Sequence, residues 1–249
     1  MFSIFRKKKF AAPDLSGIVT DMHSHLLPGI DDGSQDLETS VMLIRGMMEL
    51  GYKNLITTPH IMWDIYQNTN EIVRSAHTRL QDELTKLRIS IPVSPAAEYF
   101  LDDHFVKLLE DNTPLLTIKD NWVLIEFSFI TVPLDLSETL FKMQLKGYQP
   151  VVAHPERYMY LRDNKKFYDT LKNSGCLFQL NLLSLANNYG KAPAELAAYL
   201  IQKNYIDLLG SDIHSQRHLD ILLNAGHIMG TVQKLLDSGN IRNDSLLGS

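Results

Sequence analysis

The chain has 249 residues, with 24 Lys and Arg against 29 Asp and Glu, which gives a formal net charge of −5. This acidic balance argues against a general nucleic-acid binder, because such proteins are normally basic. No apolar run reaches the roughly 18 residues that span a bilayer. The single cysteine, Cys176, excludes an intramolecular disulfide and fits a reducing compartment. We therefore expect a cytoplasmic protein without a transmembrane segment.

The first 17 residues are expected to lie outside the fold. A basic run at residues 6–9 follows a very short apolar stretch, and no long apolar segment comes after it, so a secretory signal is not expected. We favour a flexible, solvated tail and linker. A weak contact with an anionic membrane surface or partner is the alternative. Residues 18–240 then form one catalytic domain, and residues 241–249 form a C-terminal tail.

Strand-like and helical patterns alternate along this domain. The seven apolar runs that predict strands cover residues 18–25, 54–60, 93–98, 122–127, 150–154, 176–183 and 206–212. Helical spacing follows each run, at residues 37–48, 72–87, from 102 or 103, 134–146, 167–171, around Pro193 and, as one final helix, 219–235. Thr69 or Asn70 would cap the second helix, while Gly51, Gly147 and Gly175 would end three others.

This alternation predicts an α/β fold. Strands separated by helices indicate right-handed parallel βαβ units. Seven such units make a closed or nearly closed TIM-like (β/α)7 barrel, one unit short of the common eight, and the length is within the usual size of one barrel. The alternative is an open doubly wound sheet, which cannot gather six strand ends around one point.

Six of the seven predicted strands end in His, Asp or Glu. These ends carry Asp21, His23 and His25, then His60, Glu98, Glu126, His154, and finally Asp212 and His214, while the remaining strand ends in Asn181. The carboxyl ends of parallel strands share one mouth of a barrel, so these side chains can converge there. That arrangement is typical of a multinuclear metal site.

Local spacing supports this interpretation. Residues two apart on a strand point the same way, so His23 and His25 can reach one ion. The acidic turn that follows could return Asp31 or Asp32 to the site, although turn and helix-cap chemistry is the alternative for both.

Glu98 and Glu126 end apolar runs, where an unpaired carboxylate is very costly. No basic residue lies within several positions of either. We therefore favour a metal over a buried ion pair.

Two arginines are candidates for binding phosphate. Arg157 lies three residues after His154, and its planar fork matches phosphate oxygens. Arg217 follows His214 and is the weaker candidate; a surface ion pair is the alternative for both.

Other reactive residues are left out of the site. The remaining histidines lie in or at the start of predicted helices: His77, His104, His218 and His227. Cys176 begins a strand and is expected to be a small buried residue. Cysteine phosphatases need an Arg six positions after the thiolate, where this chain has Leu182.

The chain resembles the PHP (polymerase and histidinol phosphatase) superfamily, and within it the bacterial metal-dependent protein-tyrosine phosphatases of capsule and exopolysaccharide loci. The resemblance runs from Asp21 to about Leu223. It is most specific in residues 21–34, 58–60, 97–99, 154–157 and 210–214.

The resemblance implies a distorted barrel that holds two or three divalent ions, most often Mn²⁺. The implied ligands are His23, His25, Asp32, His60, Glu98, Glu126, His154, Asp212 and His214. The family's catalytic arginine matches Arg157, and a second one aligns loosely with Arg217. Imidazole and carboxylate ligands without thiolate suit Mn, Fe or Zn.

The leading functional hypothesis is hydrolysis of protein phosphotyrosine by a metal-bridging hydroxide. By family analogy, the substrate is an autophosphorylated tyrosine kinase that controls polysaccharide synthesis or export. Five aromatic residues follow strand ends and could pack against the phenyl ring, or belong to ordinary packing: Trp63, Tyr66, Tyr99, Phe127 and Phe129. The alternatives are a small-molecule phosphatase, such as one acting on histidinol phosphate, and a barrel that binds metal or a phosphorylated partner without turnover. The sequence does not indicate an oligomeric state.

Overall fold

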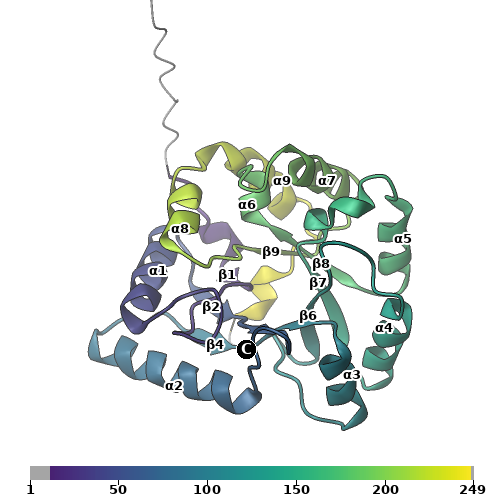
Figure 1. The fold of residues 1–249 in the computed structure, drawn as a ribbon. Coiled ribbons are helices and arrows are strands. Elements are labelled where there is room, and N and C mark those ends of the chain that lie inside the picture. Colours follow the sequence, from purple (N-terminus) through teal and green to yellow (C-terminus); the bar gives the residue numbers. More distant parts are fainter. Residues whose placement is uncertain (1–11, 248–249) are drawn as a thin grey trace, which may run out of the picture.

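The computed structural model describes residues 12–247, and in Figure 1 a ring of helices surrounds the strands. The predicted basic run at residues 6–9 lies outside the described residues. Helices α1 to α9 are Leu37–Glu49, Asn70–Lys86, Asp103–Glu110, Leu136–Leu145, Lys166–Asn173, Leu182–Leu185, Lys191–Gln202, Gln216–Leu223 and Met229–Asp237. Short 3-10 helices η1 to η5 are Ser16–Ile18, Pro155–Arg157, Met159–Leu161, Gly226–Ile228 and Asn243–Leu246. Within residues 12–247, no helix combines the length and apolarity needed to cross a membrane.

All paired strands are parallel. Strands β1 to β9 are Thr20–Asp21, Asn54–Thr57, His60–Ile61, Val93–Pro95, Glu98–Phe100, Trp122–Glu126, Gln149–Ala153, Leu177–Asn181 and Leu208–Gly210. One sheet has the order β1-β2-β4 and the other β3-β5-β6-β7-β8-β9. Since β2 leads directly into β3, and β4 into β5, each pair forms one interrupted strand of the barrel. The expected α/β fold with parallel strands is confirmed.

Backbone hydrogen bonds close the ring of seven strands between its first and last members. Ser24 and Ile213 form a parallel bridge just beyond β1 and β9. The amide of His25 donates to the carbonyl of Ile213 over 2.9 Å, and the amide of Asp212 donates to the carbonyl of His23 over 2.7 Å. The barrel is therefore closed by backbone hydrogen bonds of the candidate ligands His23, His25 and Asp212.

Side-chain caps explain where several helices begin. Thr69 and Asp102 cap α2 and α3 with their side chains, as expected. Helix α1 is capped by Asp36, whose carboxylate accepts from the amide of Thr39, and not by Asp31 or Asp32. An N-cap carboxylate satisfies amides that have no partner within the helix.

Several predicted boundaries are wrong, and two of these differences have a clear local cause. Strand β8 ends at Asn181 and not at residue 183, because the Asn181 side chain accepts from the amide of Leu183 and caps α6. The predicted final helix is two helices, α8 and α9, separated by Asn224, Ala225 and η4. Asn224 and Gly226 are poor helix formers, and the helix breaks there. The helical spacing of apolar residues continues across this break and so does not reveal it.

The segments on either side of the barrel strands belong to the fold. Leu15 in the expected linker is fully buried, and its amide donates to the carbonyl of Leu50. In the expected C-terminal tail, the Asn243 side chain donates to the carbonyls of Thr20 and Leu209, at the amino end of the barrel. Leu246 is fully buried in the barrel interior. Helix η5 therefore closes the end opposite the mouth.

Candidate metal centre

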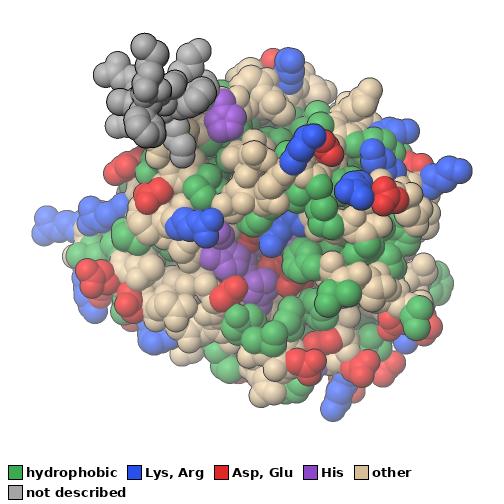
Figure 2. Space-filling model, turned by 45° about the horizontal axis from the view of Figure 1, so that its top comes forward, with side chains coloured by type: hydrophobic (Ala, Val, Ile, Leu, Met, Phe, Trp, Pro, Cys, Tyr) green, Lys and Arg blue, Asp and Glu red, His purple; other side chains and the backbone are tan. Residues whose placement is uncertain are grey.

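The carboxyl ends of the strands surround a pocket of about 540 Å³. Figure 2 shows histidine and acidic side chains inside this hollow, with hydrophobic side chains along one edge. Arg157 is the sole Lys or Arg among the described residues that line it.

The innermost part of the cluster is formed by His23, His25 and Glu98, all fully buried. Nε2 of His23 lies 3.2 Å from Oε2 of Glu98 and 3.3 Å from Nε2 of His25. The other oxygen of Glu98, Oε1, lies 3.0 Å from Nε2 of His154. One carboxylate thus joins imidazoles that follow β1 and β7.

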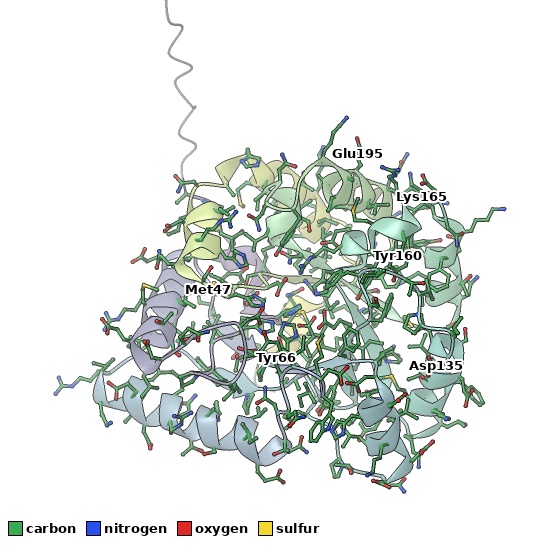
Figure 3. All side chains as sticks on the ribbon, in the orientation of Figure 1. Met47, Tyr66, Asp135, Tyr160, Lys165 and Glu195 are labelled. Atoms are coloured by element: carbon green, nitrogen blue, oxygen red, sulfur yellow. The ribbon has the colours of Figure 1, made fainter. Side chains whose placement is uncertain are left out.

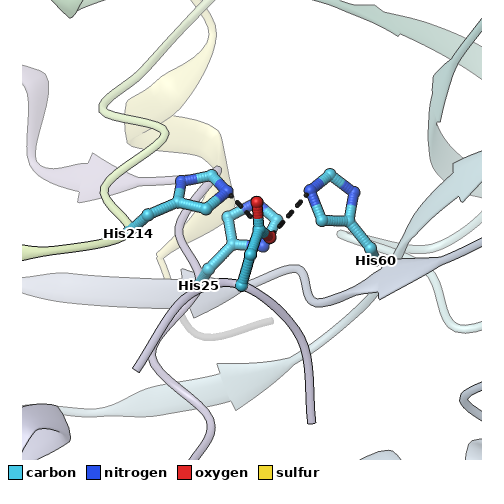
Figure 4. A group of neighbouring side chains, drawn as sticks. His25, His60 and His214 are labelled. Carbon is cyan, nitrogen blue, oxygen red and sulfur yellow. Dashed lines mark ion pairs between the residues drawn. The ribbon is translucent and has the colours of Figure 1, made fainter. Parts of the chain in front are cut away.

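A second part lies nearer the solvent. Asp32 Oδ1 is 3.5 Å from Nε2 of His60 and 3.5 Å from Nε2 of His214, and Figure 4 shows the imidazoles of His25, His60 and His214 around this carboxylate. The rings of His25 and His214 stack at 3.8 Å between centroids. Burial and the nearby His25 lower the pKa of His214 to about 4, so its ring is neutral at pH 7 and able to act as a ligand.

Overlapping groups of possible ligand atoms connect these parts. In the described residues, four groups each place one ligand atom per residue within 4.8 Å of the others: His25, Asp32, His60 and His214; His23, His154 and Asp212; His23, His25 and Glu98; and His60, Glu98 and Glu126. All nine residues expected to be ligands occur in them. Because His23, His25, His60 and Glu98 each belong to two groups, the arrangement suits adjacent ions that share ligands.

Hydrogen bonds orient three of the imidazoles. Nδ1 of His25 lies 2.8 Å from Oδ2 of Asp31, and Nδ1 of His23 lies 2.9 Å from Oε1 of Gln179. Nδ1 of His214 lies 2.9 Å from the carbonyl of Asp212. An acceptor at one ring nitrogen fixes the tautomer that directs the other nitrogen toward a metal. The Nε2 atoms of all three rings therefore fit metal ligation.

The buried carboxylates require nearby positive charge. Burial alone would lower the pKa of His23, but Glu98 and Asp212 outweigh it and raise that pKa to about 9. Burial likewise opposes protonation of His60, yet Glu98 and Glu126 raise its pKa to about 10. A divalent cation would supply this positive charge while displacing the protons. The donor set and its charge therefore fit metal binding.

Two of the candidate ligands have left-handed backbone conformations. His154 has φ of +34° and Asp212 has φ of +51°, which non-glycine residues rarely adopt. Such strain persists where surrounding contacts impose it, and it is common at functional sites. Next to Asp212, a Cβ on Gly210 would lie 2.8 Å from Cβ of His23, so only glycine fits there.

Arg157 lies at the edge of this cluster, in η2. Its Nη1 donates to Oδ2 of Asp212 over 2.8 Å, and its guanidinium lies 4.2 Å from the ring centre of Tyr189 and 4.8 Å from that of Phe129. The guanidinium lines the pocket, where a phosphate could reach it. Arg217 is exposed in the first turn of α8 and does not line the pocket.

The five aromatic candidates separate into three positions. Tyr66 and Phe129 line the pocket; Tyr66 stacks on His60, and Figure 3 shows it near the centre of the molecule. Trp63 instead stacks on His104 at 3.7 Å, beside a neighbouring pocket. Tyr99 and Phe127 are buried in the core and cannot contact a substrate in the mouth.

Sequence reasoning missed several residues of the site. Gln179 and Tyr189 gave no signal, because their contacts depend on how neighbouring strands and loops pack. His218 was left out, yet it lines the pocket, and its Nδ1 accepts from the amide of His214 over 3.3 Å. The spacing of four residues between His214 and His218 is the sequence feature that could have indicated this contact. The acidic turn predicts Asp31 or Asp32 near the site, but the turn pattern does not reveal that Asp31 is the partner of His25.

Comparisons with known proteins agree with these observations. Residues 19–232 match the family described as "Capsular polysaccharide synthesis, CpsB/CapC". Tyrosine-protein phosphatase YwqE of Bacillus subtilis is 34% identical over 196 residues, covering 78% of this chain and 77% of that protein. Tyrosine-protein phosphatase CpsB of Streptococcus agalactiae is 29% identical over 201 residues, covering 78% and 82%. A crystal structure from a study of YwqE and Streptococcus pneumoniae CpsB, described as "unique metal-dependent tyrosine phosphatases", superposes with a TM-score of 0.75 at 31% identity, covering 90% and 94% of the two chains.

Proposed function

The chain belongs to the CpsB/CapC family of capsular polysaccharide synthesis, and we propose that it is a metal-dependent phosphatase that hydrolyses phosphotyrosine in proteins. The observation that carries this proposal is the pocket itself. Its lining combines one guanidinium with six candidate ligands, and these belong to ligand groups that extend inward to the buried His23, His25 and Glu98. The residues proposed to recognise phosphate and those proposed to bind metal therefore lie in or beside one cavity.

The proposed ligands are the nine residues named from the sequence, and they would hold two or three divalent ions. Mn²⁺ is the proposed metal, with Fe or Zn as alternatives, because the ligands are nitrogen and oxygen without thiolate. Bound ions of this kind supply Lewis-acid stabilisation of a phosphoryl group and lower the pKa of water.

The protein's own groups perform the remaining tasks. Arg157 provides a planar fork that can bind two phosphoryl oxygens and stabilise charge that develops on them. Tyr66 and Phe129 offer aromatic surface to a phenyl ring. A phenolate, with a conjugate-acid pKa of ~10, leaves easily, so no strong general acid is required. Arg217, outside the pocket lining in α8, is proposed to contribute more weakly to phosphate binding.

The physiological setting is part of the same proposal. We propose an autophosphorylated tyrosine kinase of polysaccharide synthesis as substrate and the cytoplasm as location. The family supports the first of these, and the single cysteine supports the second.

Hydrolysis of matched phosphotyrosyl and phosphoseryl peptides tests the proposal. The purified protein would be treated with chelator, and Mn²⁺ would then be added back. We expect phosphotyrosyl hydrolysis that chelator abolishes and Mn²⁺ restores, with little activity on phosphoserine. Activity on neither peptide, with metal shown to be bound, would contradict the assignment and favour a small-molecule phosphoester.

A further inference from the structure

Exposed apolar side chains continue from the pocket onto the surface. Ile65 and Phe129 line the pocket and remain 65% and 42% exposed, and Ile130, next to Phe129, is 86% exposed. We call Ile65, Phe129 and Ile130 the apolar rim. Figure 2 shows hydrophobic side chains along one edge of the hollow.

The apolar rim comes from two different loops at the mouth of the barrel. Ile65 follows β3, whereas Phe129 and Ile130 follow β6. Residues 128–134 contain no charged side chain. Single exposed apolar residues are normal, but a group that adjoins a binding pocket commonly marks an interaction site.

A bound phosphotyrosine constrains what lies over this rim. Its phosphate must reach Arg157 and the ligand cluster inside the pocket, so its own backbone must remain outside. The residues on either side of it in the substrate must therefore cross the edge of the pocket. The apolar rim belongs to this edge, because Ile65 and Phe129 line the pocket and Ile130 adjoins Phe129.

We propose that the apolar rim binds the substrate segment next to the phosphotyrosine and favours apolar residues there. This inference rests on the proposed function, because it uses the phosphotyrosine to place the segment. The occupant is a substrate segment and not a second copy of the chain, because two of the three rim residues also line the cavity that receives the phosphate. Burial of an apolar flanking side chain against Ile130 would add affinity that a charged one cannot gain.

Two phosphotyrosyl peptides and one small aryl phosphate test this inference. The peptides differ only in carrying Leu or Glu beside the phosphotyrosine, and p-nitrophenyl phosphate lacks any flanking residue. Ile130→Ser is the test variant. Leu145→Ser is the matched control, because Leu145 is 69% exposed but lies in the last turn of α4, away from the mouth and outside the pocket lining.

We expect Ile130→Ser to raise KM for the Leu peptide about fivefold, since burial of an aliphatic side chain gives effects of this order. The kcat for that peptide, hydrolysis of p-nitrophenyl phosphate and every parameter of Leu145→Ser should stay unchanged. An equal kcat/KM for the two peptides with the native enzyme, or no effect of Ile130→Ser on their ratio, would overturn the inference.

Affinity measurements separate this inference from the proposed function. The same peptides would be made with a non-hydrolysable phosphonate, and their Kd values measured for the native protein and both variants. Failure to hydrolyse any aryl phosphate would refute the proposed function, while a preference for the Leu peptide lost in Ile130→Ser would still support the rim. A dimer that Ile130→Ser dissociates in sedimentation would instead assign the rim to a second copy and overturn the inference.

Discussion

Nη1 of Arg157 lies 2.8 Å from Oδ2 of Asp212, so the guanidinium proposed to bind phosphate contacts a carboxylate proposed to bind metal. Burial would lower the pKa of Arg157, but Asp212 outweighs it and raises that pKa further. The guanidinium is thus charged at every working pH. One side of it is held by Asp212, and its remaining donors can face the pocket.

Replacing Arg157 should therefore reduce phosphate recognition. We expect Arg157→Ala to lower kcat/KM for a phosphotyrosyl peptide about a hundredfold, as loss of one preorganised donor commonly does. Arg157→Lys should recover little, because an ammonium lacks the planar fork. Arg217→Ala should cost much less, because Arg217 lies outside the pocket lining. Steady-state kinetics of the three variants would measure this order, and full activity of Arg157→Ala would show that its assigned role is wrong.

Tyr189 should position Arg157. Its ring lies 4.2 Å from the guanidinium, and Asn181 Nδ2 donates both to the Tyr189 hydroxyl and to Asp212. A cation–π contact of this kind contributes enough to change affinity about three- to tenfold. We expect Tyr189→Leu to raise KM and the inhibition constant of inorganic phosphate by that factor, while Tyr189→Phe, which keeps the ring, stays near the native values. Equal values for Tyr189→Leu and Tyr189→Phe would show that the aromatic ring does not position Arg157.

Asp31 should support metal affinity without being a ligand. Its carboxylate faces Nδ1 of His25 and accepts from the amides of His60 and Gly33. An Asn side chain has one oxygen and one NH₂ group, so it cannot accept hydrogen bonds from the His25 ring and both amides as the carboxylate does. We therefore expect Asp31→Asn to weaken metal binding about 10- to 100-fold. Calorimetric titration of the chelated protein with Mn²⁺ would measure it.

The matched control for Asp31→Asn is Asp36→Asn. Asp36 is an acidic residue of the same segment, but its role is to cap α1, and Asn caps helices equally well. Native metal affinity is expected for this control. Equal losses in the two variants would show that the effect reports general damage to the segment and not the His25–Asp31 contact.

The pKa of His23 makes the metal-free protein sensitive to alkaline pH. Against the opposing effect of burial, Glu98 and Asp212 raise that pKa from an ordinary 6.5 to about 9. The folded state therefore binds this proton more tightly than the unfolded state, so the stabilising contribution of His23 should be complete below pH 6.5 and be lost as pH rises to about 9. Thermal unfolding at pH 6.5 and 9, with chelator and with Mn²⁺, would measure this. A bound cation replaces the proton, so the Mn²⁺ form should lose less stability; identical losses would contradict the argument.

The strand-end pattern is the part of the site that the sequence made predictable. In parallel βα units the carboxyl ends of the strands share a common mouth, so the predicted strand ends His60, Glu98, Glu126 and His154 could be placed together from the sequence alone. Contacts made across the barrel were not predictable. Gln179 reaches His23 because β8 pairs with β9, and the chain just beyond β9 pairs with the chain just beyond β1 through Ser24 and Ile213. No local spacing encodes that relation.

For the aromatic residues too, the sequence does not predict which side chains face the pocket. Tyr99 and Phe127 directly follow Glu98 and Glu126 and are buried in the core, where the Tyr99 hydroxyl accepts from the amide of Leu116. Phe129, three residues after Glu126, lines the pocket instead. The residue directly after the glutamate packs into the core in both cases, whether or not the strand continues beyond it. Strand β5 continues to Phe100, whereas β6 ends at Glu126. Apolar composition alone does not distinguish the core positions from the pocket position.

The barrel should depend on its C-terminal segment for stability. Leu246 is fully buried among interior residues such as Met22 and Leu124, and its carbonyl accepts from the Asn54 side chain. Removal of a buried leucine side chain costs about 2–5 kcal/mol, so Leu246→Ala should lower the free energy of unfolding by that amount. Leu247→Ala is the control, because Leu247 is 58% exposed and exposed substitutions usually change stability by about 0.5 kcal/mol or less. Urea unfolding of both variants would measure this difference. Equal unfolding midpoints for Leu246→Ala and Leu247→Ala would mean that η5 does not close the barrel in solution.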